Sequence, residues 1–325
     1  MRHATRAIIA ALFFFCVFAQ AQTNEQRTLV LVIGAPGEPE YAEKFAAWGK
    51  LWKEAALQGG VQTRVVGEDT SESPDDRERL LKLLAEEISR PAGELWLVFI
   101  GHGTFDGRSA KFNLRGPDIS AEDLAAALKP ARRPLAVVQC ASASGPFLPA
   151  LSAPGRVIIT ATRSGYEDNF PRFGGYMAGA IGSASADLDK DGQTSLLEAF
   201  LMASHQVAQY YKDQGLLMTE HALLDDNGDG LGTPPDWFRG VRPTKRAADG
   251  KAVDGLRANQ MILVRSKSEQ TLSQETRAQR DDLERQFNAL RDRKSKMDEN
   301  DYYKQLEAVM IQIARLYETG PVSKP

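Results

Sequence analysis

The 325-residue sequence has only two cysteines, Cys16 and Cys140, which excludes a fold that depends on a disulfide framework. A strongly basic composition is also absent. The chain has 40 Lys and Arg residues against 43 Asp and Glu residues, a formal net charge of −3, so it offers no electrostatic footprint for nucleic acid. After residue 18 no apolar run is long enough to cross a bilayer. What is left is a globular chain large enough for one core with attachments.

The first 21 residues have the pattern of a secretory signal peptide. A basic start precedes an apolar run over residues 7–18, and Ala19-Gln20-Ala21 matches an A-x-A cleavage site. We therefore predict an exported protein, periplasmic or secreted. Cleavage after Ala21 would remove Cys16 together with the signal, so Cys140 would be the only thiol of the mature chain. A single thiol in an exported protein is either a buried, inert side chain or a reactive one.

Apolar runs alternate with segments of helical spacing over the first half of the chain. Such alternation predicts an α/β domain with a mainly parallel sheet. The predicted strands cover residues 28–33, 61–66, 95–100, 135–140 and 156–161, and the predicted helices cover residues 41–57 and 73–88 and begin again at Ser120.

Two of these runs end in side chains that can do chemistry. The run Leu95–Ile100 leads into Gly101, His102 and Gly103, and the run from Leu135 ends at Cys140. Because parallel sheets present functional residues at the carboxyl ends of their strands, we expect His102 and Cys140 at the same edge. A cysteine nucleophile requires at least a thiol with an imidazole beside it to activate it.

These motifs resemble those of the clan CD cysteine peptidases, in particular the legumain-like branch, peptidase family C13. The segment Ile100–Gly103 matches the His-Gly element of that branch. Cys140–Gly145 resembles its Cys-x-Ser-Gly element with two residues inserted, and residues 157–164 resemble the strand that follows. The resemblance covers residues 28–182 and implies a caspase-like three-layer sandwich.

The resemblance implies an exported cysteine endopeptidase acting on peptide or protein substrates. Cys140 would be the nucleophile, with its pKa lowered by a nearby imidazolium, and His102 would protonate the leaving amine. The amides of Gly103 and Cys140 would stabilise the oxyanion. Arg163 and Ser164 are candidate substrate-binding residues, although Arg163 could instead form a structural salt bridge. The alternative function is an inactive, calcium-binding scaffold or interaction protein on the same fold.

Two acidic loops follow the predicted peptidase domain. Residues 187–198 fit the twelve-residue EF-hand loop in full, and residues 225–236 form a less regular loop that ends in Asp and contains Pro234-Pro235. The alternative is an acidic, capped turn without metal. We predict structural calcium in both loops and no organic cofactor. The predicted ligands are Asp187, Asp189, Asp191, Gln193, Ser195, Glu198, Asp225, Asn227, Asp229, Leu231 and Asp236.

The C-terminal part turns charged and helical after Ser266. Apolar residues repeat at helical spacing on either side of a predicted bend at 294–301, which predicts a helical hairpin. We expect it to pack or self-associate, and a minor hypothesis has it cover the active site, as the helical pro-region of legumain does. The predicted domains are the signal peptide 1–21, the peptidase domain 22–182, a calcium-loop helical extension 183–241, a linker with a short strand at 260–264 within 242–265, and the hairpin 266–325.

Overall fold

The computed structural model describes residues 26–69, 75–90, 93–245 and 253–318. The predicted signal peptide, residues 1–21, lies outside the described residues. None of the helices in the described ranges is both long and apolar enough to span a membrane.

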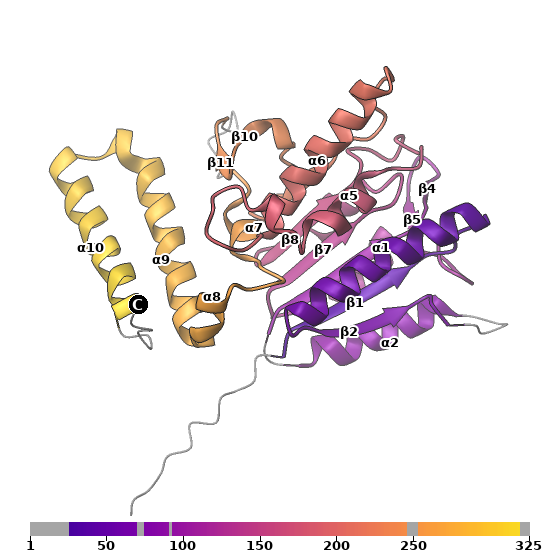
Figure 1. The fold of residues 1–325 in the computed structure, drawn as a ribbon, viewed down its shortest axis with the longest axis horizontal. Coiled ribbons are helices and arrows are strands. Elements are labelled where there is room, and N and C mark those ends of the chain that lie inside the picture. Colours follow the sequence, from indigo (N-terminus) through magenta and orange to yellow (C-terminus); the bar gives the residue numbers. More distant parts are fainter. Residues whose placement is uncertain (1–25, 70–74, 91–92, 246–252, 319–325) are drawn as a thin grey trace, which may run out of the picture.

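A six-stranded sheet forms the centre of the molecule (Figure 1). Its strands are, in order across the sheet, β2 (Gln62–Val66), β1 (Thr28–Ile33), β3 (Leu95–Ile100), β7 (Leu135–Gln139), β8 (Arg156–Thr160) and β9 (Leu223–Asp225). The first five pair in parallel and β9 pairs antiparallel with β8. The five predicted strands are therefore confirmed. Strand β9 was not predicted, because three residues give too short a pattern to recognise.

Helices cover both faces of the sheet and complete a three-layer α/β sandwich, as the sequence predicted. One face packs against α1 (Pro39–Gln58), α5 (Phe173–Ala180) and α6 (Leu196–Asp213). The other face packs against α2 (Asp76–Ile88), α3 (Ala121–Leu128) and α4 (Phe147–Leu151). β1, β3 and β7 are buried along their whole length, which explains why they are continuous apolar runs rather than alternating ones.

Helix starts follow local sequence signals. Ser120 caps α3 in a reciprocal capping box with Asp123. The start predicted for the second helix, Ser73, lies outside the described residues, and the N-cap of α2 is Asp75, whose side chain accepts from the amide of Glu78.

A small antiparallel sheet follows directly after β3. It consists of β4 (Gly103–Phe105), β5 (Ala110–Phe112) and β6 (Ile119–Ser120). The prediction of a loop or hairpin over residues 103–114 is confirmed. Because β4 begins at Gly103, the chain is already held in a second sheet one residue after His102.

The C-terminal segment is mostly helical between Leu256 and Glu318. Helices α7 (Leu256–Gln260) and α8 (Lys267–Thr271) precede a hairpin of α9 (Gln274–Arg293) and α10 (Glu299–Glu318), whose turn falls inside the predicted bend. The predicted strand over 260–264 is wrong: Gln260 ends α7, and only Ile262 forms an isolated bridge, to Ser195. A short apolar run does not distinguish a strand from a buried extended segment.

The segment before the hairpin docks at the amino ends of the strands. Arg27, just before β1, donates to the carbonyls of Ile262 and Leu263. Arg265 pairs with Glu94, just before β3, at 3.0 Å. The hairpin is thus joined to the edge opposite His102, and Figure 1 shows α9 and α10 at one side of the molecule. This placement contradicts the hypothesis that the hairpin covers the active site.

Candidate active site

The carboxyl ends of β3 and β7 lie side by side and form the candidate active site. Phe99 pairs with Gln139 in the parallel ladder, so His102 and Cys140 leave the sheet at the same edge, as predicted. Gly101 makes the exit of β3 possible, since a Cβ there would lie 2.7 Å from the ring of Phe112.

The His102 ring has a defined orientation. Its Nε2 lies 3.2 Å from the carbonyl oxygen of Pro36. Three aromatic rings surround it, with Tyr41 at 4.6 Å and Phe45 at 5.2 Å between ring centroids and Phe170 at 5.7 Å. Burial lowers the pKa of His102 below its ordinary 6.5, more than the Pro36 hydrogen bond and the Glu38 charge raise it. The imidazole is therefore neutral near pH 7.

The protonation state of that ring follows from its partner. A carbonyl oxygen only accepts hydrogen bonds, so Nε2 carries the proton when it contacts Pro36. In the neutral ring, Nδ1 then has a free lone pair. The contact thus prepares His102 to act as a base through Nδ1.

Cys140 lies in the core instead of in an open site. The side chain is 1% exposed and packs in the cluster of β-strand, α1, α5 and α6 residues. A Cβ on Gly174 of α5 would lie 2.8 Å from the Cys140 Cβ. Burial raises the pKa of the thiol to about 12. The expectation that a nearby imidazolium lowers this pKa is therefore wrong, because loss of hydration disfavours the thiolate.

The backbone amide of Cys140 also has a hydrogen-bond partner already. It donates to the carbonyl of Phe99 at 2.9 Å and so continues the ladder between β7 and β3. It does not face an oxyanion, contrary to what the resemblance implied. In the described part of the chain, no hydrogen bond joins the thiol to His102.

Ser142 is the hydroxyl that the fold brings to the His-Gly element. Its Oγ accepts from the amide of Gly103 at 3.2 Å and donates to the Gly103 carbonyl at 3.0 Å. The two backbones approach so closely that a Cβ on Gly103 would lie 2.3 Å from the Ser142 carbonyl oxygen. Only glycine fits there.

The turn after Ser142 has a strained backbone that is held by hydrogen bonds. Ala143 has φ of 52°, in the left-handed region that favours glycine. Its amide donates to the Glu167 carbonyl at 2.8 Å. The hydroxyl of Thr162 contacts Ser144 Oγ at 3.1 Å and accepts from the amide of Gly145 at 3.0 Å. Such strain persists only where surrounding contacts enforce it, and it concentrates at functional sites.

The sequence prediction missed Ser142, although a signal was present. Aligning Cys140 with the Cys-x-Ser-Gly element required two inserted residues. Ser142-Ala143-Ser144-Gly145 has the same spacing with no insertion and with serine in the first position. The sequence pattern favours Cys140 because a thiol is intrinsically more nucleophilic than a hydroxyl at neutral pH.

The two candidate substrate-binding residues have local partners. Arg163 Nε lies 3.1 Å from Glu167 Oε1, although the arginine side chain is 61% exposed. The alternative of a salt bridge at Arg163 is what the structure contains. Ser164 Oγ accepts from the amide of Tyr166 at 3.3 Å and closes a turn. Glu167 Oε1 also contacts His221 Nδ1 at 2.6 Å, so His221 holds this loop rather than taking part in the site.

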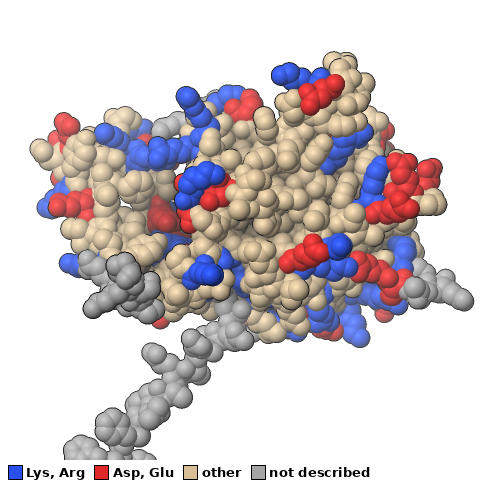
Figure 2. All heavy atoms as spheres, viewed as in Figure 1, with Lys and Arg blue, Asp and Glu red and all other residues tan. Residues whose placement is uncertain are grey.

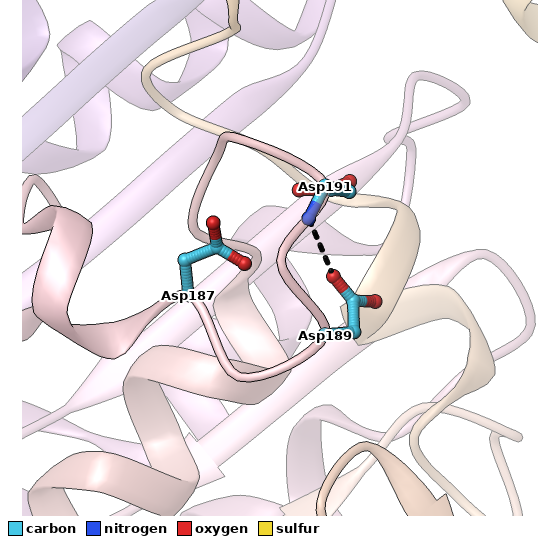
Figure 3. Close-up of side chains that lie close together, drawn as sticks. All are labelled: Asp187, Asp189 and Asp191. Atoms are coloured by element: carbon cyan, nitrogen blue, oxygen red, sulfur yellow. Dashed lines mark hydrogen bonds between the residues drawn. The ribbon is translucent and has the colours of Figure 1, made fainter.

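The first acidic loop gathers three carboxylates. Figure 3 shows Asp187, Asp189 and Asp191 grouped around one loop, and one oxygen of each lies within 4.8 Å of the others. Burial, followed by the charges of neighbouring carboxylates, raises the pKa of Asp189. Burial also raises the pKa of Asp191. A divalent cation would relieve this repulsion.

The remaining residues of this loop differ from the predicted ligand arrangement. Glu198 accepts from the amides of Leu188 and Ser195 and completes the capping box of α6, so its oxygens are used within the protein. Ser195 is the N-cap of α6. Gln193 donates from its side-chain Nε2 to Asp191, which leaves its backbone carbonyl, the predicted ligand, untested. Three of the predicted ligands therefore converge, while Glu198 would have to turn to coordinate with both oxygens.

The second acidic loop repeats the hydrogen bonds of the first. Asp225 accepts from the amides of Gly228 at 3.0 Å and Gly230 at 3.1 Å, as Asp187 accepts from the amides three and five residues later. The same repetition holds for Asn227 with Asp229, and for Asp229 with Leu231. The last residues of the second loop differ from those of the first.

Asp236, the predicted last ligand, pairs with Lys245 at 2.5 Å. The residues Pro235–Trp237 form a short 3-10 helix instead of an exit helix. Leu231, whose backbone carbonyl was the predicted ligand, has a side chain that is 58% exposed.

The charged surface elsewhere is mixed, and Figure 2 shows acidic and basic side chains interspersed over the visible face.

Comparison with known proteins gives similarity to solved structures only. No family model matches the chain, and no curated protein matches it. The chain is similar to caspase-1 from Spodoptera frugiperda (11% identity, TM-score 0.41, covering 62% of this chain and 87% of that one). It is also similar to the Drosophila initiator caspase Dronc (13%, 0.42, 65% and 84%) and to a protein from Geobacter sulfurreducens (10%, 0.41, 62% and 93%). None of these values implies a shared activity or substrate.

Proposed function

We propose that the protein is a hydrolase that cleaves peptide bonds at the edge formed by β3 and β7, with His102 as general acid and base. The observation that supports this most is the contact between His102 Nε2 and the Pro36 carbonyl. It leaves Nδ1 as the basic nitrogen of His102, and Gly103 follows His102 directly in the chain. The Gly103 amide can stabilise a developing oxyanion. A ring fixed in this way contributes about 10²–10⁴-fold to a rate.

In the legumain-like form of this proposal, Cys140 is the nucleophile and peptide or protein chains are the substrates. The Ile100–Gly103 motif supports it. The 1% exposure of Cys140 and its raised thiol pKa count against it. Arg163 would recognise an acidic side chain only after release from Glu167.

Peptide-library hydrolysis by wild type, His102→Ala and His205→Ala tests the proposal. His205 is an exposed histidine on α6 and serves as the matched control. We expect cleavage by wild type and His205→Ala and a loss of about 10²-fold or more in His102→Ala. A wild-type protein that cleaves no peptide, or a His102→Ala variant as active as wild type, would refute it.

The second candidate function is a non-catalytic scaffold or interaction protein stabilised by calcium. The buried thiol favours it, because a protein that does not use Cys140 as a nucleophile can keep it in the core. The same peptide-library experiment separates the two functions, since the scaffold would show no cleavage in any variant.

We also propose that both acidic loops bind calcium as a structural ion and that the protein acts after export. The carboxylates of Asp187, Asp189 and Asp191 are suitable hard ligands for calcium. Purification from the periplasm or medium, followed by N-terminal sequencing, tests export; a mature chain that begins at Gln22 is expected.

A further inference from the structure

We infer, on the basis of the proposed hydrolase function, that Ser142 is the nucleophile of this site and attacks the carbonyl carbon of a peptide or ester bond with His102 as its base. Ser142 Oγ bonds both the amide and the carbonyl of Gly103, the residue next to His102. Both residues are buried, Ser142 at 3% and Cys140 at 1% exposure, but the thiol packs among apolar side chains between the sheet and α5, whereas the hydroxyl bonds the His-Gly element.

The position of Ser142 relative to the sheet supports this assignment. Cys140 is still part of the ladder, since its amide bonds the Phe99 carbonyl. Ser142 lies two residues beyond Cys140, and its hydroxyl hydrogen-bonds Gly103 of the His-Gly element. The spacing of Ser142-Ala143-Ser144-Gly145 also restores a nucleophile-x-Ser-Gly pattern without an insertion. The contact geometry and the sequence spacing are independent and point to the same residue.

The backbone after Ser142 is built as a rigid support. Ala143 adopts a φ of 52° although it is not glycine, a conformation that persists only where surrounding contacts enforce it. The Glu167 carbonyl holds that conformation through the Ala143 amide at 2.8 Å. Thr162 fixes the next two residues through its hydroxyl. A sharp, clamped turn of this kind fixes the position of the preceding side chain.

The state of His102 suits a hydroxyl better than a thiol. A serine stays protonated and needs a neutral imidazole to remove its proton during attack. His102 is neutral near pH 7 because burial lowers its pKa. A cysteine nucleophile instead works as a thiolate beside an imidazolium, and the raised thiol pKa of Cys140 opposes that pair.

The structure contains the resting form of the site. In the described part of the chain, Ser142 bonds Gly103 and no hydrogen bond joins it to His102. Rotation about χ1 would break both bonds to Gly103, and the inference requires that the released hydroxyl then bonds His102, since catalytic hydrogen bonds often form only with substrate bound. The same rotation frees the Gly103 amide, which then becomes available for the oxyanion.

The reaction follows from these positions. Ser142 Oγ forms a bond to the carbonyl carbon while its proton passes to His102 Nδ1. The carbon–nitrogen bond breaks, and the leaving amine takes that proton from His102. Water then attacks the acyl-serine, gives one proton to His102 and releases the acid, and Ser142 Oγ regains its proton.

An alkyl fluorophosphonate tests the assignment in the folded full-length protein. Ser142 Oγ would displace fluoride and form a bond to phosphorus, and peptide mass spectrometry would locate the adduct. We expect the adduct at Ser142 in wild type and in Cys140→Ala, and formation slower by about 10²-fold or more in His102→Ala. No adduct at Ser142, or an adduct formed equally fast without His102, would overturn the assignment.

Variants separate this inference from the proposed function. Ser142→Ala should lower peptide hydrolysis by about a thousandfold or more. Ser204→Ala is the control, because Ser204 is also buried and also donates to a backbone carbonyl, but lies on α6. If Cys140→Ala abolishes hydrolysis and Ser142→Ala retains it, the hydrolase stands and Ser142 is rejected. An adduct at Ser142 in a protein that cleaves no peptide rejects the peptidase and supports a reactive Ser142. The adduct is measured in the wild-type protein. The test therefore remains decisive even if Ser142→Ala misfolds.

Discussion

His102 Nε2 lies 3.2 Å from the carbonyl oxygen of Pro36, and this contact decides which nitrogen of the ring is basic. Three segments meet at the ring, which itself follows β3: Pro36 lies in the loop between β1 and α1, Tyr41 lies on α1, and Phe170 lies just before α5. The candidate site therefore depends on packing between elements that are distant in sequence.

The pH dependence of activity should reflect this environment. Burial lowers the pKa of His102 below 6.5, so the basic form persists to lower pH than in a free histidine. We expect the acid limb of the kcat/KM profile to have its midpoint below pH 6.5, and NMR titration of the imidazole should give the same value. A midpoint above 6.5 would contradict the burial argument.

The same shift predicts the sign of a stability effect. Unfolded His102 binds its proton more tightly than the folded one, so stability rises with pH between the folded pKa and 6.5. The contribution is complete above 6.5 and is lost as pH falls through the folded pKa. His102→Gln should flatten this part of the unfolding profile, measured by urea denaturation at each pH. An unchanged slope would show that other groups dominate.

Cys140 should be unreactive while the protein is folded. Its thiol pKa is raised to about 12 by burial, so iodoacetamide at pH 7 should alkylate the folded chain far more slowly than the urea-unfolded chain, in which the pKa returns to about 8.5. Cys140→Ala should cost about 1 kcal/mol of unfolding free energy. Rapid alkylation near pH 6 that slows in His102→Ala would instead support the cysteine peptidase.

Gly103→Ala should damage both stability and activity. The new Cβ would lie 2.3 Å from the Ser142 carbonyl oxygen, a backbone atom that cannot move cheaply. We expect a loss of about 1–3 kcal/mol, measured by urea unfolding. Gly179→Ala on α5 is the matched control, because a Cβ there meets nothing within 4 Å. Equal stability of the two variants would mean that β4 relaxes away from Ser142.

Calcium should stabilise the protein through the acidic loops. Binding at a hundredfold excess over Kd adds about 2.7 kcal/mol, so calcium should raise Tm and EDTA should reverse the rise. Asp189→Asn with Asp191→Asn should remove the part of the shift that comes from the first loop. Asp213→Asn, an exposed acid at the end of α6, should not. A Tm independent of calcium in wild type would refute binding.

The hairpin offers a surface for self-association. Met310 is 54% exposed and Ile311 is 43% exposed on α10, and such apolar side chains favour association with a second copy. Sedimentation analysis should detect a dimer in wild type and a monomer in Met310→Glu with Ile311→Glu. Leu57→Glu is the control, since Leu57 is 81% exposed on α1. A monomeric wild type at the highest concentration would reject the surface.

Local sequence patterns were enough to predict several features of the fold. Buried runs such as Leu95–Ile100 predicted the parallel sheet, and Ser120 with Asp123 predicted the start of α3. The spacing of Asp187, Asp189 and Asp191 determined a loop whose carboxylates accept amides two to five residues away. These features need no distant partner, so the sequence pattern suffices.

Which side chain reaches the site depends on long-range packing. Cys140 continues the alternation of Ala136 and Val138, which face the core, and the packing of α5 closes over it. Ser142 meets Gly103 because a separate strand, β4, begins there and the backbones approach closely. Strand alternation limits each side chain to one of two faces, but which face is covered depends on helices far away in sequence. The same long-range packing placed the hairpin at the opposite edge, through Arg27 and Arg265.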